Sequence, residues 1–431
     1  MKTYEISIYS NDAEPIHIRL DSTTDEIDFS KVPLVQDLKL IFTTDPLLAD
    51  GRIIIGKIEN AHYNNVAKLV QKHAHINMPQ LKGLPSKIGK FTNGNHYAIA
   101  FNRPLNTNEF VALMTQLEAM DKNMPVQSLF QQLNDTCGEV LSHYDFIGQE
   151  GTKRWSAGPS VRSERVCRYC HRSMPEVKFD NIAHTISEGL ENKNIITNDE
   201  CDICNDYFGK NVEPHLLEYV SLFRVMFNVQ GKKGKIHHIY GENYEVINKQ
   251  DGKNSIDINI RTEYADGDQI PYITEQPVEL ISQNDIIMQN VYKSLVKYAL
   301  GILPPDKLKS FSRTVEWLLG NITITDLPLV RLSISPVKID HPNVMVFIRK
   351  SQDETLPYAM AELNVINLKF VYIIPLCDNT DVRFLDPNSV NRINEVFKGY
   401  AATHWQALNL SSNVPMKFKN RIYFSLSQEE R

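Results

Sequence analysis

The sequence has no apolar run that approaches the ~18–20 residues needed for a membrane-spanning helix. Its first residues, MKTYEISIYSND, alternate polar and apolar side chains and contain no apolar signal core. Both absences argue against an export signal and a membrane anchor. We therefore expect a soluble, cytoplasmic protein whose partners do not include a membrane.

The chain also lacks a strong charge of one sign and an evenly spread set of cysteines. Its formal net charge of −6 argues against a surface that wraps nucleic acid on all sides, so any such contact needs a local basic patch. Four of the 6 cysteines cluster, unlike those of a disulfide scaffold. Cys137 and Cys377 stand alone and are most simply small, buried apolar residues.

What is present is a chain of 431 residues, too long for one ordinary domain, with 42% hydrophobic residues to build cores. Alternating stretches such as TYEISIYS predict strands, and stretches such as NNVAKLVQKHA have apolar residues at helical spacing. We expect a multidomain α+β protein in which two α+β domains flank a central metal module. The expected parts are an accessory, sensor or recognition domain at 1–150, the module at 151–235, ending in the basic GKKGK, and a C-terminal domain of unknown role at 236–431.

Two Cys-x-x-Cys pairs, Cys167/Cys170 and Cys201/Cys204, give the strongest chemical signal. Two residues between cysteines let both thiolates of a pair reach one ion from a tight turn. In an intracellular chain such pairs predict a metal site rather than disulfides. We expect a structural Zn²⁺ site, because four thiolates close the tetrahedral shell and leave no position open for catalysis.

The stretch between the pairs predicts a strand (KFDNIAHTI), a turn, a short strand (IIT) and a helix that begins near Cys204. Three motif elements lie on it. They are Ala183-His184-Thr185-Ile186, Leu190-Glu191-Asn192-Lys193, and Glu200-Cys201-Asp202-Ile203-Cys204-Asn205 followed by Phe208-Gly209. In order and spacing these elements resemble the zinc-clasped HNH endonucleases, which have the ββα-metal fold. The resemblance is confined to the module and says nothing about the flanking regions.

The resemblance implies a metal-dependent endonuclease that hydrolyses phosphodiester bonds in DNA. It makes His184 the general base, Asn192 the residue that holds the histidine-bearing loop, and Asn205 a ligand of the catalytic cation, Mg²⁺ or another divalent ion. Histidine suits the first role because it titrates near neutral pH, and a cation stabilises charge on the leaving oxygen. Two plainer roles remain open: His184 as a core histidine, and Asn205 as a helix N-cap.

Two positions depart from the family's pattern. Ala183 stands where many HNH sites have an acidic metal ligand directly before the histidine. Glu191 replaces the usual glycine before Asn192 and is strained if the turn needs a positive φ angle. The candidates for the missing ligand are Asp180, Asn181, Glu188 and Glu213. These departures keep open a catalytically inactive zinc module that binds nucleic acid or takes part in assembly.

Basic residues gather around the first cysteine pair. Such a run is typical of a solvated surface, but it also has the right charge to grip a phosphate backbone. The residues are Lys153, Arg154, Arg162, Arg165, Arg168 and Arg172. By analogy with the family we expect a role in bacterial restriction or antiviral defence, with a protein partner or an activating signal read by the flanking domains. RNA remains an alternative substrate, because the fold does not fix the sugar.

Overall fold

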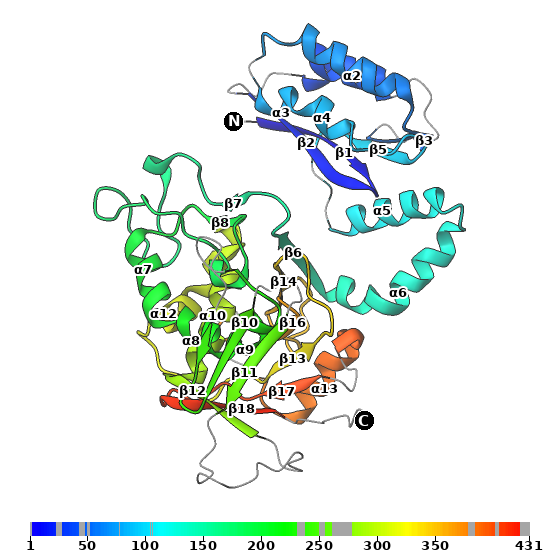
Figure 1. Cartoon of the computed structure of the whole chain (residues 1–431). Coiled ribbons are helices and arrows are strands. Elements are labelled where there is room, and N and C mark those ends of the chain that lie inside the picture. The colour runs from blue at the N-terminus through cyan, green and yellow to red at the C-terminus, as the bar shows by residue number, and fades with distance from the viewer. Residues whose placement is uncertain are drawn as a thin grey trace. The chain divides into compact units, whose positions relative to one another are not determined.

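The computed structural model of the chain describes residues 2–22, 28–42, 48–49, 52–76, 78–103, 105, 107–230, 238–249, 255–260, 278–377, 384–400 and 405–422 (Figure 1). Both helices and strands are abundant in these ranges, which confirms the α+β content. None of the described helices combines the length and the apolar character that crossing a bilayer requires. The predicted break at 231–235 lies outside the described residues. Contacts divide the chain into two compact units, Met1–Leu141 and Ser142–Arg431.

The first unit is built on an antiparallel sheet with the strand order β2-β1-β5-β4-β3. Alternation along the β1–β2 hairpin places Ile6, Ile8 and Ile18 in the core, where they are fully or almost fully buried. Helix α1 adds Leu34 and Leu38 to the same core at helical spacing. The strands are β1 (Lys2–Ser10), β2 (Ala13–Ser22), β3 (Leu48–Ala49), β4 (Ile53–Lys57) and β5 (His96–Ala100). The helices are η1 (Phe29–Lys31), α1 (Pro33–Phe42), α2 (Asn60–Lys72), α3 (Pro79–Lys82), α4 (Leu84–Ile88), α5 (Thr107–Asp121) and α6 (Val126–His143).

The second unit contains a six-stranded antiparallel sheet in the order β17-β13-β16-β15-β14-β6. Strand β6 precedes the cysteine pairs in the sequence, yet it pairs with β14 along its whole length. The strands of this sheet are β6 (Tyr144–Glu150), β13 (Val330–Ile334), β14 (Asn343–Arg349), β15 (Ala359–Val365), β16 (Leu368–Ile373) and β17 (Gln406–Leu408). The sequence boundary expected at residue 150 therefore falls after a strand that belongs to the second unit.

Three smaller sheets complete the second unit. Strand β7 (Trp155–Ala157) pairs in parallel with β8 (Ile195–Thr197). The others are β9 (Ile239–Tyr240), β10 (Tyr244–Lys249) and β11 (Ser255–Ile260), and the pair β12 (Val278–Ile286) and β18 (Met416–Ile422). The helices are η2 (Arg162–Glu164), η3 (Glu188–Leu190), α7 (Asp202–Asn211), α8 (Glu213–Tyr219), α9 (Ser221–Met226), α10 (Met288–Gly301), α11 (Pro305–Leu308), η5 (Lys309–Phe311), α12 (Ser312–Leu318), α13 (Pro387–Val396) and η6 (Lys398–Tyr400).

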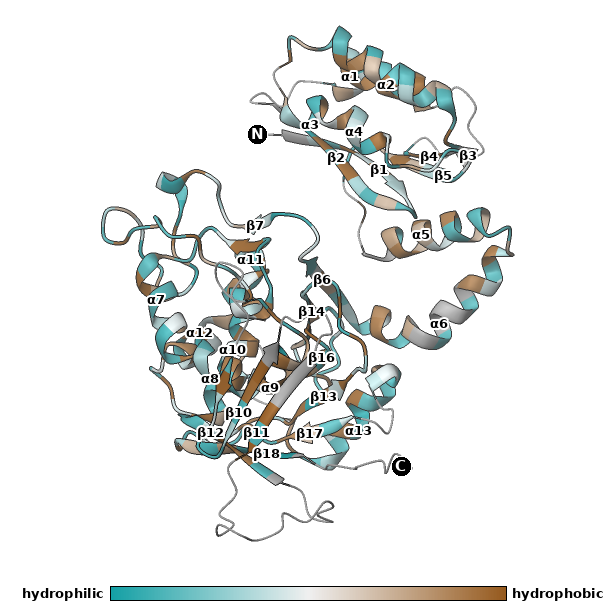
Figure 2. Ribbon diagram, viewed as in Figure 1, coloured by the Kyte–Doolittle hydropathy of each residue, from teal (hydrophilic) through white to brown (hydrophobic). Residues whose placement is uncertain are grey.

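One hydrophobic core runs through most of the second unit. It joins Cys167 and Phe208 of the cysteine-bearing stretch to Leu295 of α10 and Phe370 of β16. Helix α10 is buried at nearly every position and packs against α8, β14 and β15. By contrast, α7 is largely hydrophilic (Figure 2). The expected division between 151–235 and 236–431 is thus not a division between two cores, because the cysteine-bearing stretch buries its apolar side chains against elements from both sides of it.

Candidate metal centre and histidine site

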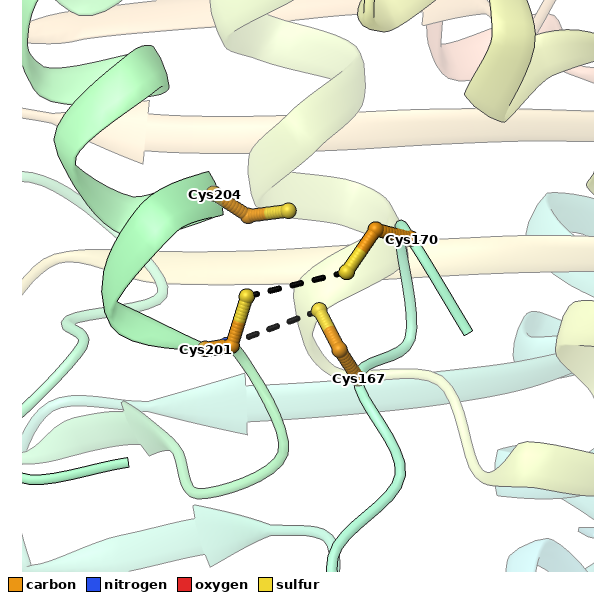
Figure 3. A group of neighbouring side chains, drawn as sticks. All are labelled: Cys167, Cys170, Cys201 and Cys204. Atoms are coloured by element: carbon orange, nitrogen blue, oxygen red, sulfur yellow. Dashed lines mark hydrogen bonds between the residues drawn. The ribbon is translucent and has the colours of Figure 1, made fainter. Parts of the chain in front are cut away.

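The two cysteine pairs meet in space. Cys167 and Cys170 lie on a tight turn closed by the Val166–Ser173 bridge, and Cys201 and Cys204 lie at the N-terminal end of α7. All four sulfur atoms fall within 4.8 Å of one another, and their side chains point toward a common centre (Figure 3). The Cys170 and Cys201 sulfurs are 3.7 Å apart. Tetrahedral zinc with Zn–S bonds of about 2.3 Å requires a sulfur separation of about 3.8 Å. These residues can therefore hold a metal ion such as zinc.

The surroundings of the sulfur atoms suit thiolate ligands. The Cys201 backbone N–H donates to Cys167 Sγ at 3.5 Å, and Arg172 Nε lies 3.5 Å from Cys170 Sγ. Hydrogen bonds from the Cys167 and Cys204 thiols lower the pKa of Cys201 well below that of a free thiol. The same crowding raises the pKa of Cys204, because hydrogen bonds to Cys167 and Cys201 favour its protonated form. A bound cation would relieve this conflict by stabilising all four thiolates at once.

His184 lies on a short extended segment beside β8. The backbone pairs His184 with Ile196 in an antiparallel bridge, and Thr185 N–H donates to Ile195 O at 3.0 Å. The long strand expected over KFDNIAHTI is wrong, because only this bridge forms. At Asp180 and Asn181 the backbone N–H groups donate instead to the side chain of Asp202, at 3.2 and 3.0 Å.

The imidazole of His184 is held by a carboxylate. Its Nε2 atom lies 3.2 Å from Glu188 Oε1, and the two side chains are 18% and 32% exposed. The other ring nitrogen, Nδ1, is buried, so a ligand can reach the imidazole only on the side of Nε2 and Glu188. Of the four candidates for the missing acid, Glu188 is thus in contact with the histidine. Asp180 is exposed and paired with Arg162 at 3.0 Å, and Glu213 is paired with Lys297 at 3.0 Å. Asn181 is exposed.

Asn192 is fully buried and pins the loop between the two paired segments. Its Nδ2 donates to Ile186 O at 2.7 Å and to Ile195 O at 2.9 Å. Its Oδ1 accepts from the N–H groups of Asn194 and Ile195, at 3.1 and 2.9 Å. Every polar group of the amide is engaged with the backbone. This geometry suits a residue that holds the histidine-bearing loop in shape.

The neighbouring Glu191 has a φ angle of 64°, the left-handed conformation that glycine adopts without strain. The turn does need a positive φ angle at this position, so the backbone strain predicted for Glu191 is present. The Glu191 side chain forms an ion pair with Lys338 at 2.7 Å. That contact helps to offset the cost of a side chain in this conformation, which is of order 1 kcal/mol.

Asn205 is not a helix N-cap. Cys201 occupies the cap position, and Asn205 lies within α7, where its N–H donates to Cys201 O at 2.9 Å. The Asn205 side chain is half-buried. The structure thus removes the capping alternative, and the role of cation ligand remains a prediction.

The predicted basic patch divides into exposed and buried members. Lys153, Arg154, Arg162 and Arg172 are exposed, and Arg165 is half-buried with its guanidinium on two backbone carbonyls. Arg168 is wrong as a phosphate contact, because its side chain is only 1% exposed. It pairs with Asp199 at 2.7 Å and donates to the carbonyls of Leu300 and Gly301 at 2.7 and 3.0 Å. Tight turning between the two cysteines directs this arginine inward.

Sequence reasoning missed Lys297 of α10, which reaches the histidine segment from a distant part of the chain. Its Nζ donates to the backbone carbonyl of His184 at 3.0 Å. The sequence did carry a signal, since Lys293 and Lys297 lie one turn apart in a stretch, 291–300, whose other residues are mostly apolar. Lysine is almost never fully buried unless it is paired.

No known protein family, curated protein or solved structure matches this chain. The chemistry of the site follows from its own residues. They offer a four-sulfur metal site with no open position, and beside it a partly exposed imidazole oriented by a carboxylate. The first arrangement suits a structural role, and the second suits acid–base chemistry.

Proposed function

We propose that this chain is a metal-dependent endonuclease of the HNH kind that hydrolyses phosphodiester bonds in DNA. The observation that supports this best is the His184–Glu188 contact, on a segment that pairs with β8 and is locked by Asn192, between the two cysteine arms. The order of short paired segments followed by α7 agrees with a ββα unit.

In this proposal the four cysteines hold structural zinc, which fixes the turn at Cys167 to the start of α7. His184 takes a proton from the attacking water as the new P–O bond forms and the bond to the leaving oxygen breaks. Because Nδ1 is buried, the proton goes to Nε2, and Glu188, 3.2 Å from that atom, stabilises the imidazolium that results. A divalent cation, for which Asn205 is the proposed ligand, supplies charge stabilisation at the leaving oxygen when bound. The exposed residues Lys153, Arg154, Arg162 and Arg172 are the proposed phosphate contacts.

Cleavage assays with the His184→Ala variant test this function. Purified wild-type chain is incubated with supercoiled plasmid or with single-stranded RNA, in Mg²⁺, Mn²⁺ or Ni²⁺. We expect plasmid cleavage, slowed by about 10²–10⁴-fold in His184→Ala, because a general base contributes this much. His238→Ala is the matched control, since His238 is an exposed histidine of the same unit.

Three results would contradict the proposal in different ways. DNA binding without cleavage under every condition would favour a binding-only module. Cleavage of RNA alone would change the substrate. Unaltered cleavage by His184→Ala would remove the assignment of the base.

A further inference from the structure

Helix α10 carries two lysines on one face, four residues apart, and both are buried. Lys293 is 8% exposed and Lys297 is 1% exposed. Burying an ammonium group is costly unless it is paired and hydrogen-bonded. The two ammonium groups have different partners, and this difference indicates different roles.

Lys293 has an aromatic neighbour and no carboxylate partner among the described residues. Its Nζ lies 5.4 Å from the centre of the Trp317 ring. Burial lowers its pKa to about 8. The Lys293 ammonium therefore lies against α12, which carries Trp317.

Lys297 instead reaches two carboxylates and two carbonyls. Its Nζ lies 3.0 Å from Glu213 Oε1 and 3.4 Å from Glu200 Oε2. The carbonyls are those of His184, at 3.0 Å, and Thr185, at 3.5 Å. The Glu213 carboxylate pairs with the buried ammonium, and the two carbonyls accept its remaining protons. Lys297 is thus a charged donor inside the protein.

The carbonyl of His184 needs such a donor because of the strand register. In the bridge between His184 and Ile196, the hydrogen bonds run from Thr185 N to Ile195 O and from Thr197 N to Ala183 O, at 3.0 and 2.8 Å. His184 therefore occupies a pair that exchanges no hydrogen bonds, so its own carbonyl points away from β8. A buried carbonyl without a partner is costly. The Lys297 ammonium provides that partner.

The C-terminal end of α10 is fixed to the same segment. A Cβ atom on Gly301 would meet Thr185 Cγ2 at 2.5 Å, so the absence of a side chain permits this close approach. The last carbonyls of the helix accept from Arg168, which lies between the first two cysteines. One helix end thus contacts both the histidine segment and the metal-binding turn.

We propose that Lys297 is a positioning residue for His184, supplied by a helix outside the HNH-like stretch. The catalytic part of this inference rests on the proposed function. Lys297 fixes the His184 carbonyl, and through it the direction from which the imidazole leaves the backbone. Since a misplacement of about 1 Å can cost about 10²-fold in rate, this anchor governs turnover rather than substrate binding.

The first test is the Lys297→Met substitution in the full chain. We expect kcat for plasmid cleavage to fall by about 10²-fold, with KM changed by less than about twofold. Lys293→Met is the matched control, because it makes the same change one turn earlier on the same helix. It should leave kcat within about threefold of wild type.

A second variant guards against simple misfolding. Lys297→Met alone strands Glu200 and Glu213 without a cation, which destabilises a buried cluster. The triple variant Lys297→Met/Glu200→Gln/Glu213→Gln removes the three charges together and should fold and retain zinc. We expect it to remain slow, and Lys297→Arg, which keeps a charged donor, to recover part of the rate. A folded, zinc-loaded triple variant with wild-type kcat would overturn the proposal.

A third measurement does not depend on cleavage. The ring signals of His184, assigned in an NMR spectrum by their loss in His184→Ala, should shift in Lys297→Met and stay in place in Lys293→Met. If the wild-type chain does not cleave, the proposed function fails, but this spectrum still decides whether Lys297 positions the ring. Unshifted His184 signals in Lys297→Met would overturn the inference.

Discussion

At the residue scale, the four sulfur atoms form a closed group that depends on every member. We expect Cys201→Ser to lose bound zinc and to lower the melting temperature of the second unit, because a structural metal contributes its binding free energy to folding. Zinc analysis and a thermal melt measure both effects. Cys137→Ser is the control, since Cys137 lies outside the cluster. Unchanged zinc content in Cys201→Ser would refute the four-cysteine site.

The second prediction at this scale concerns the buried side chain of Asn192. The Asn192→Ala variant loses four hydrogen bonds and leaves backbone groups of the loop unpaired. We expect the free energy of unfolding to fall by roughly 2–4 kcal/mol, from about 1 kcal/mol for each net hydrogen bond. Chemical denaturation measures it. Lys193→Ala, at the exposed neighbouring position, should change stability by less than about 0.5 kcal/mol.

Residues whose partners are close in sequence could be predicted, and residues with distant partners could not. The cysteine spacing announces a metal site because each pair reaches the ion from its own turn. Asn192 likewise bonds within its own loop. Glu188 could be placed only among four candidates, since a carboxylate shows no partner in sequence. Arg168 was misassigned because its partners on α10 lie far along the chain.

At the scale of elements, the sequence predicted a strand and a helix where periodicity was strong, as in β1 and α2. It was less accurate where local hydrogen bonds compete with the expected element. The apolar spacing of KLKSFSRTVEWLL, residues 307–319, is typical of one helix, but the structure has α11, η5 and α12 in succession. The strand expected around His184 is shorter than predicted, because the backbone N–H groups of Asp180 and Asn181 donate to the Asp202 carboxylate and not to a neighbouring strand. Hydrogen bonds of this kind come from residues that the fold brings together, and the spacing of apolar residues along the sequence does not reveal them.

The close approach of α10 to the histidine segment can be tested through its last residue. We expect Gly301→Ala to lower the free energy of unfolding by about 1–3 kcal/mol, because the added methyl group would overlap Thr185. Gly209→Ala in α7 is the control, since a Cβ there meets nothing within 4 Å. That change should be neutral or stabilising by up to about 1 kcal/mol. A harmless Gly301→Ala would show that the two segments are not tightly packed.

The attachment of α13 should depend on pH. Hydrogen bonds from Thr355 and then Arg392 lower the pKa of Asp353 from 3.8 to about 2. Because the folded form binds its proton less readily than the unfolded chain, this contact stabilises the protein above about pH 4, and the contribution is lost as the pH falls toward 2.

We therefore expect Asp353→Asn to be less stable than wild type at pH 7 by at most about 1 kcal/mol, since the pair is partly exposed. The difference should shrink between pH 4 and pH 2, as measured by urea denaturation. Glu395→Gln removes the other, more exposed partner of Arg392 and should have a smaller effect. A constant difference across this pH range would contradict the assignment.

At the scale of the whole molecule, each unit has its own core. Core residues such as Ile6 and Leu38 belong to the first unit, whereas Phe208 and Leu295 belong to the second. We expect the fragment 142–431 to fold alone, to bind zinc and to melt cooperatively. The fragment 151–235 should not, because its apolar residues lose the surface of α10 and the six-stranded sheet. Calorimetry and zinc analysis of the two fragments measure this. A cooperative, zinc-loaded 151–235 would show that the module is independent.

Contact between Lys297 and His184 also has a consequence for the timing of synthesis. The two residues are 113 positions apart in the chain. At about 5–20 residues per second, a ribosome needs roughly 6–23 s to travel between them. For most of that interval both cysteine arms and the histidine are already made, but the lysine that fixes the histidine does not yet exist. Under the proposed function, a chain that has not yet reached α10 therefore holds its histidine without the anchor that full activity requires.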